Sequence, residues 1–399
     1  MNTIIIHLES ISMIHLQQFQ ELYYKLYNLP IKRIWFNNFY STSTSTIMAI
    51  ADVLSGDMSK YETSISSSRL KDSKPHILSL NKVIPNSKAL FYPPFWSSSD
   101  LFSLKQLFPN FELFGSYSCF RNEIRNYLNK YNDFTLFIYD GSSSLAMLEN
   151  AEINNESYLE QWYKGKLRTI ETVYFVIECL FASKLQDKVQ LVIYGDHGND
   201  FLTHKSGRGH THCFEPYNDL THVPLIYYHP RLDNQHVEKV FSMKNLYALI
   251  INGLCNNADN NNFTQFLYEQ ESFAFARNLY SMQSEAEIGL KKAYSITDGT
   301  YSLIVSSSGV EMYANSFDPT NHCNLLTYFT MQTNGMLVYK VSKGMSKQFS
   351  YVINEKRARE IINEYIILKS KLYEAIKEVS RDANKFLFEE LDFNTINHI

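Results

Sequence analysis

The sequence has few of the features that mark secreted, membrane-spanning or nucleic-acid-binding proteins. Its 399 residues include five cysteines without a Cys-x-x-Cys pair, which argues against a disulfide framework or a zinc knuckle. The formal net charge of −4 argues against a basic surface for nucleic acid. No apolar run has the length of a membrane span, and no signal peptide is visible before the apolar residues 3–8. We therefore expect a cytoplasmic protein with reduced thiols.

Hydrophobic residues make up 45% of the chain, enough for one large α/β domain with an accessory part. Short apolar runs at residues 3–8, 134–139 and 191–194 are typical of buried parallel strands. Apolar residues at three- and four-residue steps between 157 and 185 predict a long helix. Chemistry is therefore expected where the strands end.

Asp196 and His197 follow the strand predicted at residues 191–194. Asp offers a hard oxygen and His a neutral nitrogen, so the pair suits a metal ion. Gly198 would keep a side chain away from that ion. On its own the pair is explained equally well as a turn with a capping Asp.

Glu9 stands in the matching place after the first predicted strand. Two parallel strands would bring Glu9 and Asp196 to the same crevice. The alternative is that Glu9 caps the helix that follows.

A run of alternating Ser and Thr, residues 41–46, leads into the apolar segment 47–54 and is called the hydroxyl run below. The first N–H groups of a helix in this segment would be unpaired and would attract an anion such as phosphate. A hydroxyl at the helix start could also act as a nucleophile. A flexible loop or a helix cap is the plainer explanation.

The order of these pieces resembles the alkaline phosphatase/sulfatase superfamily. Its members have a strand ending in a metal-binding acid, a nucleophile at a helix start and a later strand ending in Asp-His-Gly. The resemblance implies a three-layer α/β/α sandwich around a mostly parallel sheet, with a small C-terminal antiparallel sheet and, here, a C-terminal helix. Counting back from Ser55-Gly56 by the family spacing reaches Thr46, with Thr44 as the alternative. Sulfatases need Cys or Ser for conversion to formylglycine, so Thr46 implies the phosphotransferase and phosphodiesterase branches.

Two-metal members of this superfamily have an Asp at another strand end and a His four residues later. Asp140 follows the strand predicted at 134–139, but Ser144 stands in the place of the His. The resemblance is therefore closer to lipoteichoic acid synthases, which have a Leu-Glu-Ser context like residues 8–10. It implies one divalent metal ion, Zn²⁺ or Mn²⁺, with Mg²⁺ also compatible. The expected ligands are Glu9, Thr46, Asp196 and His197.

A histidine-rich segment, residues 204–212, precedes the sequence Thr-His-Val-Pro at 221–224, which resembles phosphoethanolamine transferases. In those enzymes a histidine between the two motifs faces the phosphoryl group or a second metal, and His210 or His212 would take this role. His222 is expected to support the fold. The segment could instead be a solvated loop. Substrate phosphate would be held by Lys205, Arg208 and Thr44.

We expect a metal-dependent catalytic α/β domain at residues 1–290, a small β subdomain at 291–345 and a helical tail at 346–399. Turn residues between 293 and 313 predict hairpins, and the Asn-rich stretch 256–262 predicts a surface connection. Residues 355–381 have the pattern of an amphipathic helix. This helix either packs on its own domain or pairs with a second copy as a homodimer.

These parts predict an enzyme, a metal-dependent phosphotransferase that acts through a phosphothreonine at Thr46. It would move a phosphoethanolamine- or phosphoglycerol-like group from a small-molecule or nucleotide-linked phosphodiester donor to an alcohol or sugar acceptor, such as a surface-glycan precursor. The first alternative is a phosphodiesterase, phosphatase or sulfatase-like hydrolase of the same superfamily. The second is a catalytically inactive relative that only binds a partner.

Overall fold

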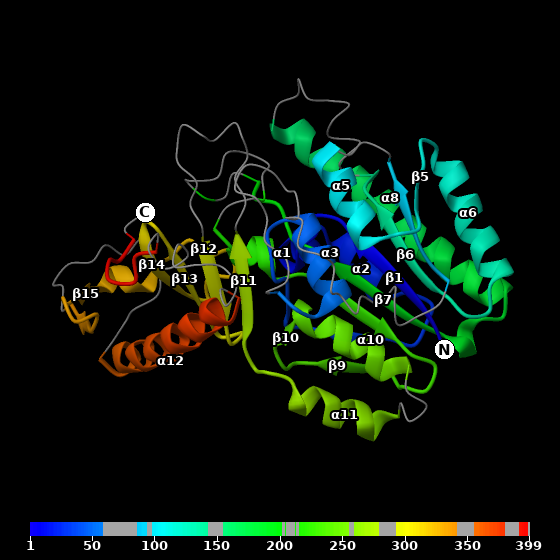
Figure 1. Ribbon diagram of the computed structural model, residues 1–399. Coiled ribbons are helices and arrows are strands. Elements are labelled where there is room, and N and C mark those ends of the chain that lie inside the picture. The colour runs from blue at the N-terminus through cyan, green and yellow to red at the C-terminus, as the bar shows by residue number, and fades with distance from the viewer. Residues whose placement is uncertain are drawn as a thin grey trace.

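The computed structural model describes residues 1–58, 86–93, 98–142, 155–201, 204, 212, 215–254, 259–278, 293–340, 355–379 and 391–397. Its centre is an eight-stranded sheet in the order β5-β4-β6-β1-β7-β8-β2-β9 (Figure 1). Strand β8 runs antiparallel to both of its neighbours, and the other pairs are parallel. The strands are β1 (Asn2–Leu8), β2 (Ile34–Phe36), β4 (Ser87–Tyr92), β5 (Phe111–Leu113), β6 (Thr135–Asp140), β7 (Val189–Gly195), β8 (Leu225–Tyr228) and β9 (Gln235–Val237).

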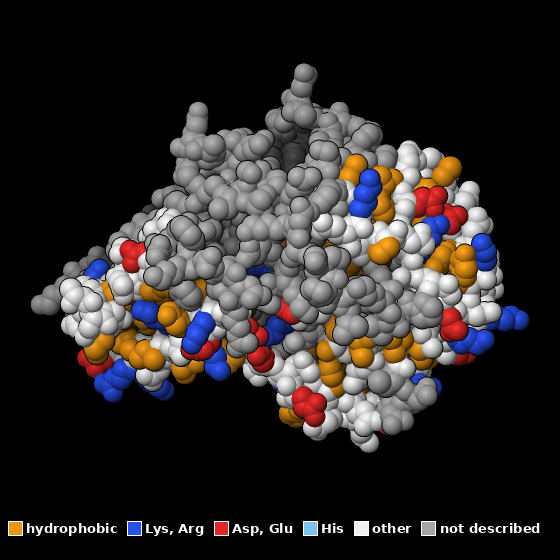
Figure 2. Space-filling view, in the orientation of Figure 1, with side chains coloured by type: hydrophobic (Ala, Val, Ile, Leu, Met, Phe, Trp, Pro, Cys, Tyr) orange, Lys and Arg blue, Asp and Glu red, His pale blue; other side chains and the backbone are white. Residues whose placement is uncertain are grey.

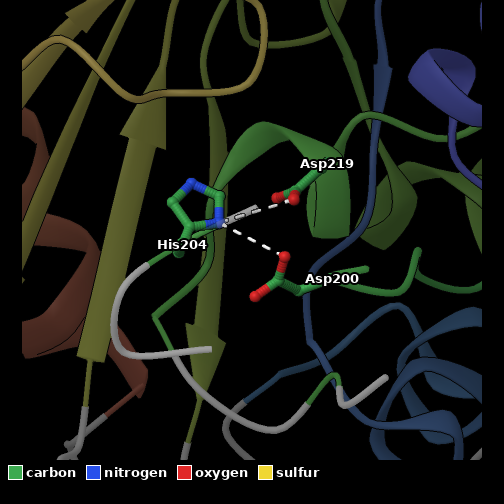
Figure 3. A group of neighbouring side chains, drawn as sticks. All are labelled: Asp200, His204 and Asp219. Atoms are coloured by element: carbon green, nitrogen blue, oxygen red, sulfur yellow. Dashed lines mark ion pairs between the residues drawn. The ribbon is translucent and has the colours of Figure 1, made fainter. Parts of the chain in front are cut away.

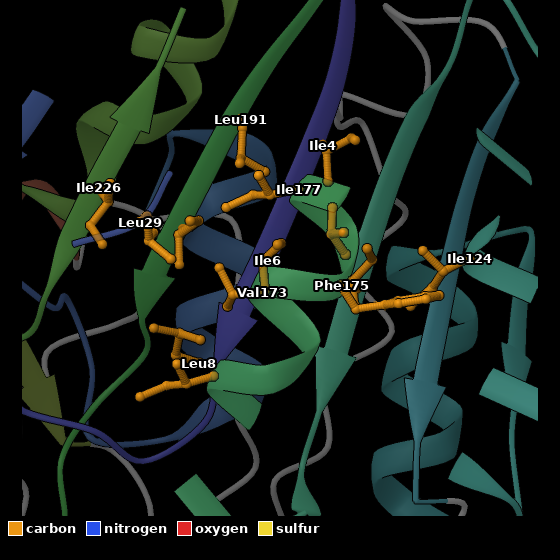
Figure 4. Packing of buried hydrophobic residues seen from close by; sticks show 14 of the residues in the cluster. Ile4, Ile6, Leu8, Leu29, Ile124, Val173, Phe175, Ile177, Leu191 and Ile226 are labelled. Carbon is orange, nitrogen blue, oxygen red and sulfur yellow. The ribbon is translucent and has the colours of Figure 1, made fainter. Parts of the chain in front are cut away.

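Helices cover both faces of this sheet, which is why its central strands are apolar on both sides. On β1, Ile4 and Ile6 contribute to one buried cluster (Figure 4), and Ile5 contributes to the other. The first face carries α1 (Met13–Gln18), α2 (Gln20–Tyr27), α6 (Tyr117–Lys130) and α8 (Asn155–Ala182). The second carries α3 (Thr46–Ser55), α5 (Ser98–Leu107), α10 (Leu246–Leu254) and α11 (Asn260–Glu269). The predicted three-layer sandwich is confirmed.

A second, antiparallel sheet lies beside the sandwich, and α12 (Glu355–Val379) packs on it (Figure 1). The apolar stripe of α12, which includes Leu368 and Leu372, is fully buried against side chains such as Leu303. The predicted hairpins and the predicted amphipathic helix are confirmed. The sheet consists of β11 (Ala274–Asn278), β12 (Ala293–Thr297), β13 (Tyr301–Ser306) and β14 (Gly309–Ala314), and the pair β15 (Phe329–Met331) and β16 (Leu337–Tyr339) follows it.

The Asn-rich stretch is only partly a connection. Residues 255–258 lie outside the described residues, and α11 begins at Asn260. Asp259 caps this helix, because its Oδ1 accepts the backbone N–H of Asn262 at 2.8 Å. The prediction of a surface connection was therefore wrong from Asn260 onward, since it took the asparagines as turn residues and overlooked the cap.

Two short strands and a 3₁₀ turn complete the second face of the sandwich, where β3 (Phe39–Tyr40) pairs with β10 (Phe241–Ser242). Among the described helices, none is both long and apolar enough to cross a membrane. On the face shown in Figure 2, Lys and Arg are interspersed with Asp and Glu over the described surface. This mixture agrees with the small net charge.

Candidate functional site

Three parallel strands end side by side and bring acidic side chains to one edge of the sheet. Leu8 pairs with Gly195 across β1 and β7, so Glu9 and Asp196 follow at the same level. Asp140 ends β6, the neighbour of β1 on its other side. The adjacency expected from the sequence for Glu9 and Asp196 is therefore present.

Asp196 is fully buried among polar groups from both strands. Its Oδ1 accepts the Ser10 N–H at 2.8 Å, and its Oδ2 lies 3.2 Å from Nε2 of His7 and 3.2 Å from Nε2 of His197. Burial opposes the negative charge, yet the His197 and His7 rings and the Ser10 N–H hold the pKa of this carboxyl well below its usual range. His7 was missed by the sequence analysis; its one signal is a polar ring inside an apolar strand, opposite Tyr194.

Thr46 is the first residue of α3 and faces His197. Nδ1–H of His197 donates to the Gly198 carbonyl at 2.8 Å, which leaves Nε2 to accept the Thr46 hydroxyl at 3.0 Å. Thr46 is partly exposed, whereas residues 41–45 are all buried. Within the hydroxyl run, Thr46 is thus the side chain that both reaches solvent and contacts the Asp-His pair.

Thr44 lies deeper, and its hydroxyl is 3.3 Å from Asn278 Oδ1. Its carbonyl accepts Nδ1–H of His212 at 2.7 Å, and the His212 ring stacks on His197 with centroids 4.1 Å apart. Burial and the neighbouring His197 lower the pKa of His212 to about 4, so this ring is neutral near pH 7. The structure therefore places Thr44 and His212 beside Thr46, while Lys205, Arg208 and His210 lie outside the described residues.

Lys166 of α8 is a buried cation at the site that the sequence analysis missed. Its Nζ donates to the Glu9 carbonyl and lies 3.5 Å from Glu9 Oε2, while Ser10 Oγ–H donates to Glu9 Oε1 at 2.9 Å. Burial lowers the pKa of Lys166, although the Glu9 and Asp196 carboxylates oppose this change. The signal was available, because Lys166 stands four residues after the core residue Trp162 and four before the core residue Ile170.

The Asp140 carboxylate is held by hydroxyl groups. Oδ1 accepts the Ser142 hydroxyl at 2.5 Å and the Ser142 N–H at 3.0 Å, and Oδ2 accepts the Thr172 hydroxyl at 2.5 Å. Burial raises the pKa of Asp140 in spite of these donors. Ser144 lies outside the described residues. The Asp140 carboxylate itself accepts hydrogen bonds from hydroxyl groups on both of its oxygens.

A divalent ion fits the atoms that converge around Asp196. Asp196 Oδ2 is buried without a hydrogen-bond donor of suitable geometry, and it lies beside the Nε2 atom of His197 that also contacts Thr46. One carboxylate oxygen, one imidazole nitrogen and one hydroxyl oxygen form a donor set that Zn²⁺ or Mn²⁺ accepts. Glu9 follows the neighbouring strand at the same level, with its carboxylate on Ser10 and Lys166.

A second group of possible ligands was not predicted. Asp200, His204 and Asp219 are buried, and one ligand atom from each lies within 4.8 Å of the other two (Figure 3). His204 Nδ1 is 3.7 Å from Asp200 Oδ1 and 3.6 Å from Asp219 Oδ2. Burial would lower the pKa of His204, but the two carboxylates raise it to about 9. This trio could bind a metal ion.

Gly198 is required by the close approach of the backbone. A Cβ at this position would lie 1.8 Å from the Asp219 carbonyl oxygen, and the Gly198 N–H donates to the Leu220 carbonyl at 2.8 Å. The sequence analysis explained Gly198 by the space needed for an ion, whereas the structure shows that α9 (Asn218–Thr221) packs directly on it.

No family model matches the chain, and no curated protein matches it. Solved structures do match. A 2-O GAG sulfatase superposes with a TM-score of 0.65 at 14% identity, over 98% of this chain and 94% of its own. A protein solved with its substrate D-glucosamine-2-N,6-O-disulfate gives 0.59 at 12% identity, over 96% and 99%. The phosphonate monoester hydrolase of Agrobacterium radiobacter gives 0.56 at 12% identity, over 85% and 99%. The chain therefore has the fold of the sulfatases and of this hydrolase.

Proposed function

We propose that this chain is a metal-dependent hydrolase of phosphoric esters with Thr46 as its nucleophile. The observation that carries the proposal is the contact of 3.0 Å between the hydroxyl of Thr46, a partly exposed residue, and Nε2 of His197, beside buried Asp196. The similar solved structures include sulfatases and a phosphonate monoester hydrolase, and this favours hydrolysis over group transfer. A Thr at this place favours a phosphate ester over a sulfate ester as substrate, because the family resemblance implies that a sulfatase would have Cys or Ser there.

The residues of the chain define the steps. The Thr46 hydroxyl gives its proton to Nε2 of His212 as its oxygen attacks phosphorus. The bond from phosphorus to the leaving alcohol breaks, the alcohol oxygen takes that proton, and a phosphothreonine forms. Water then attacks phosphorus, the bond to Thr46 breaks, and a proton returns to the hydroxyl. Backbone N–H groups in the first turn of α3 donate to the phosphoryl oxygens. A divalent ion held by Glu9, Thr46, Asp196 and His197 would lower the pKa of the hydroxyl and neutralise phosphoryl charge.

His212 has a supporting role in this scheme. With Nδ1–H donated to the Thr44 carbonyl, its Nε2 remains a proton acceptor, and the low pKa keeps that nitrogen unprotonated near pH 7. We assign His212 to exchange of the proton of the attacking water or the leaving alcohol. Lys205 and Arg208 remain predicted substrate contacts, and His210 remains the predicted alternative to His212 beside the phosphoryl group.

A phosphotransferase is the second candidate. It is favoured by the Leu-Glu-Ser context of residues 8–10 and by Thr-His-Val-Pro at 221–224, which both resemble transferases of this superfamily. An alcohol or sugar acceptor would then replace water in the second step. The cytoplasmic location and the phosphodiester donor stay part of this proposal. A homodimer through α12 would have to use its exposed side chains, such as Ile366 and Tyr373, because its apolar stripe is buried on its own sheet.

Activity on a substrate panel tests the proposal. The metal-loaded protein is assayed on p-nitrophenyl phosphate, a p-nitrophenyl phosphodiester and a p-nitrophenyl sulfate, each with and without an added alcohol. We expect turnover of a phosphoester, little turnover of the sulfate, and mainly the water product. A dominant alcohol-transfer product would select the second candidate. Turnover of the sulfate alone would contradict the proposal.

The hydroxyl run supplies matched variants for the nucleophile. Thr46→Ala is expected to lower kcat by several orders of magnitude with little change in Tm, because it removes the attacking oxygen from the helix start. Thr46→Ser keeps the hydroxyl and should retain part of the rate. Thr44→Ala is the control, since Thr44 lies behind the site on Asn278. Loss of turnover in Thr44→Ala with normal turnover in Thr46→Ala would move the nucleophile to Thr44.

A further inference from the structure

We propose that Asp200, His204 and Asp219 bind a second divalent ion, of the Zn²⁺ or Mn²⁺ type, at a structural site separate from Thr46. Asp200 comes from the turn after β7, Asp219 comes from α9, and His204 stands between them in the sequence. Figure 3 shows both carboxylates directed at the same edge of the imidazole. This inference concerns residues that have no part in the proposed chemistry, so it stands or falls independently of it.

The orientation of His204 is fixed as in metal-binding histidines. Its Nε2–H donates to the Thr320 carbonyl at 2.8 Å, so Nδ1 is the nitrogen that faces the two carboxylates. Tyr217 stacks on the ring with centroids 3.9 Å apart and an interplanar angle of 6°, and His322 stacks at 4.8 Å. A backbone carbonyl behind the ring is the usual support of a ligating imidazole, because it sets the tautomer and the ring direction.

The charges at this point suit a bound cation. The Asp200 and Asp219 side chains are 0% and 3% exposed, and their facing oxygens both approach Nδ1 of His204. Two buried carboxylates at one place repel each other unless a positive charge lies between them. A proton on His204 supplies one positive charge, whereas a divalent ion supplies two. One nitrogen and two carboxylate oxygens favour Zn²⁺ or Mn²⁺ over Mg²⁺ or Ca²⁺.

An ion bound at Asp219 would also affect the shape of the proposed catalytic site next to it. Asp219 lies on α9, whose Leu220 carbonyl accepts the Gly198 N–H next to His197. The adjacent Asn218 is tied to the C-terminal part, because its N–H donates to Asn321 Oδ1 at 2.7 Å. An ion on Asp219 would therefore hold the turn with Asp196 and His197 against both sheets without touching the substrate.

Metal counting on the full chain tests the inference. The protein is stripped with chelator, dialysed against Zn²⁺ or Mn²⁺ and analysed for bound metal. We expect two equivalents in the natural protein and one in His204→Gln or Asp219→Asn, with a smaller rise of Tm on metal addition. The exposed His236→Gln is the matched control and should keep both equivalents. Asp196→Asn should lose the other equivalent together with activity, so failure of the proposed catalytic site is seen separately.

A second readout protects the test against variants that misfold. In the metal-saturated natural protein, nitrogen NMR should show His204 with a proton on Nε2 alone. Two protonated ring nitrogens under saturating metal would show an imidazolium between the carboxylates and would overturn the proposal. An unchanged metal count in folded His204→Gln would also overturn it.

Discussion

At the scale of single residues, burial sets the pKa of His15, which lies next to the turn that carries Asp196 and His197. His15 is 2% exposed, and its ring lies between Trp162 and Phe201, with centroids 5.0 Å and 4.7 Å away. Burial lowers its pKa from 6.5 to about 3, against a hydrogen bond with the Asn199 backbone. The folded chain therefore holds this ring neutral where the unfolded chain would protonate it.

This pKa shift predicts acid sensitivity. The unfolded state binds a proton at His15 below pH 6.5 and the folded state only near pH 3, so the stabilisation is complete above 6.5 and is lost as the pH falls. The loss is about 1.4 kcal/mol per pH unit in this window. Urea denaturation at several pH values should show a shallower dependence for His15→Gln than for the natural protein. Parallel curves would contradict this assignment.

A close backbone approach gives another prediction for a single residue. Gly198→Ala places a methyl group 1.8 Å from the Asp219 carbonyl oxygen, so the backbone of α9 or the Asp-His turn has to move. We expect the free energy of unfolding to fall by about 1–3 kcal/mol and the activity to fall strongly. Gly115→Ala is the control, because a Cβ there meets nothing within 4 Å. A fully active and stable Gly198→Ala would show that the turn tolerates a displaced α9.

At the scale of elements, a buried ion pair holds α3 against the second sheet. Arg277 of β11 donates through Nη1 and Nη2 to the two oxygens of Asp52 at 3.0 Å each, and both side chains are buried. The Thr42 hydroxyl donates to Asp52 Oδ2 at 2.6 Å, and the Arg277 N–H donates to the Thr42 carbonyl at 3.0 Å. The residues that precede Thr46 are thus fixed by contacts from α3 and from β11 of the second sheet.

A double-mutant cycle tests this connection. Asp52→Leu or Arg277→Met should each lower the free energy of unfolding by about 3–5 kcal/mol, because the remaining partner stays buried without its counter-charge. The double variant Asp52→Leu with Arg277→Met should cost less than the sum of two such single losses. Additive losses in urea denaturation would show that the pair is not coupled.

Local patterns could predict most elements but not the contacts between distant residues. The apolar runs of β1, β6 and β7 and the helix that starts at Thr46 were readable, since each depends on neighbouring side chains. Gly56 ends α3 with a φ of 65°, the left-handed conformation that favours Gly after the last turn of a helix. The spacing of Lys166 signals its burial, but its partner Glu9 and the Asp52 partner of Arg277 could not be read, because both lie far away in the sequence.

At the scale of the whole molecule, the two sheets meet at the proposed catalytic site. The end of the eight-stranded sheet supplies Asp196 and His197, while β11 of the second sheet contacts the hydroxyl run through the bridge between Ser43 and Arg277. The sequence predicted both sheets, and the sulfatase fold is confirmed over nearly the whole chain. At this meeting point Thr46, the first residue of α3, is partly exposed.

The most direct measurement of the central claim is mass spectrometry of a trapped intermediate. The metal-loaded protein is mixed with a p-nitrophenyl phosphoester, quenched in acid within the first turnovers and digested. We predict one added phosphoryl group, or its substituted form, on the peptide that contains Thr46, fragment ions that place it on Thr46, and no such adduct in Thr46→Ala. Turnover at the natural rate with an unmodified Thr46 peptide in every quench, or an adduct on another residue, would contradict the account.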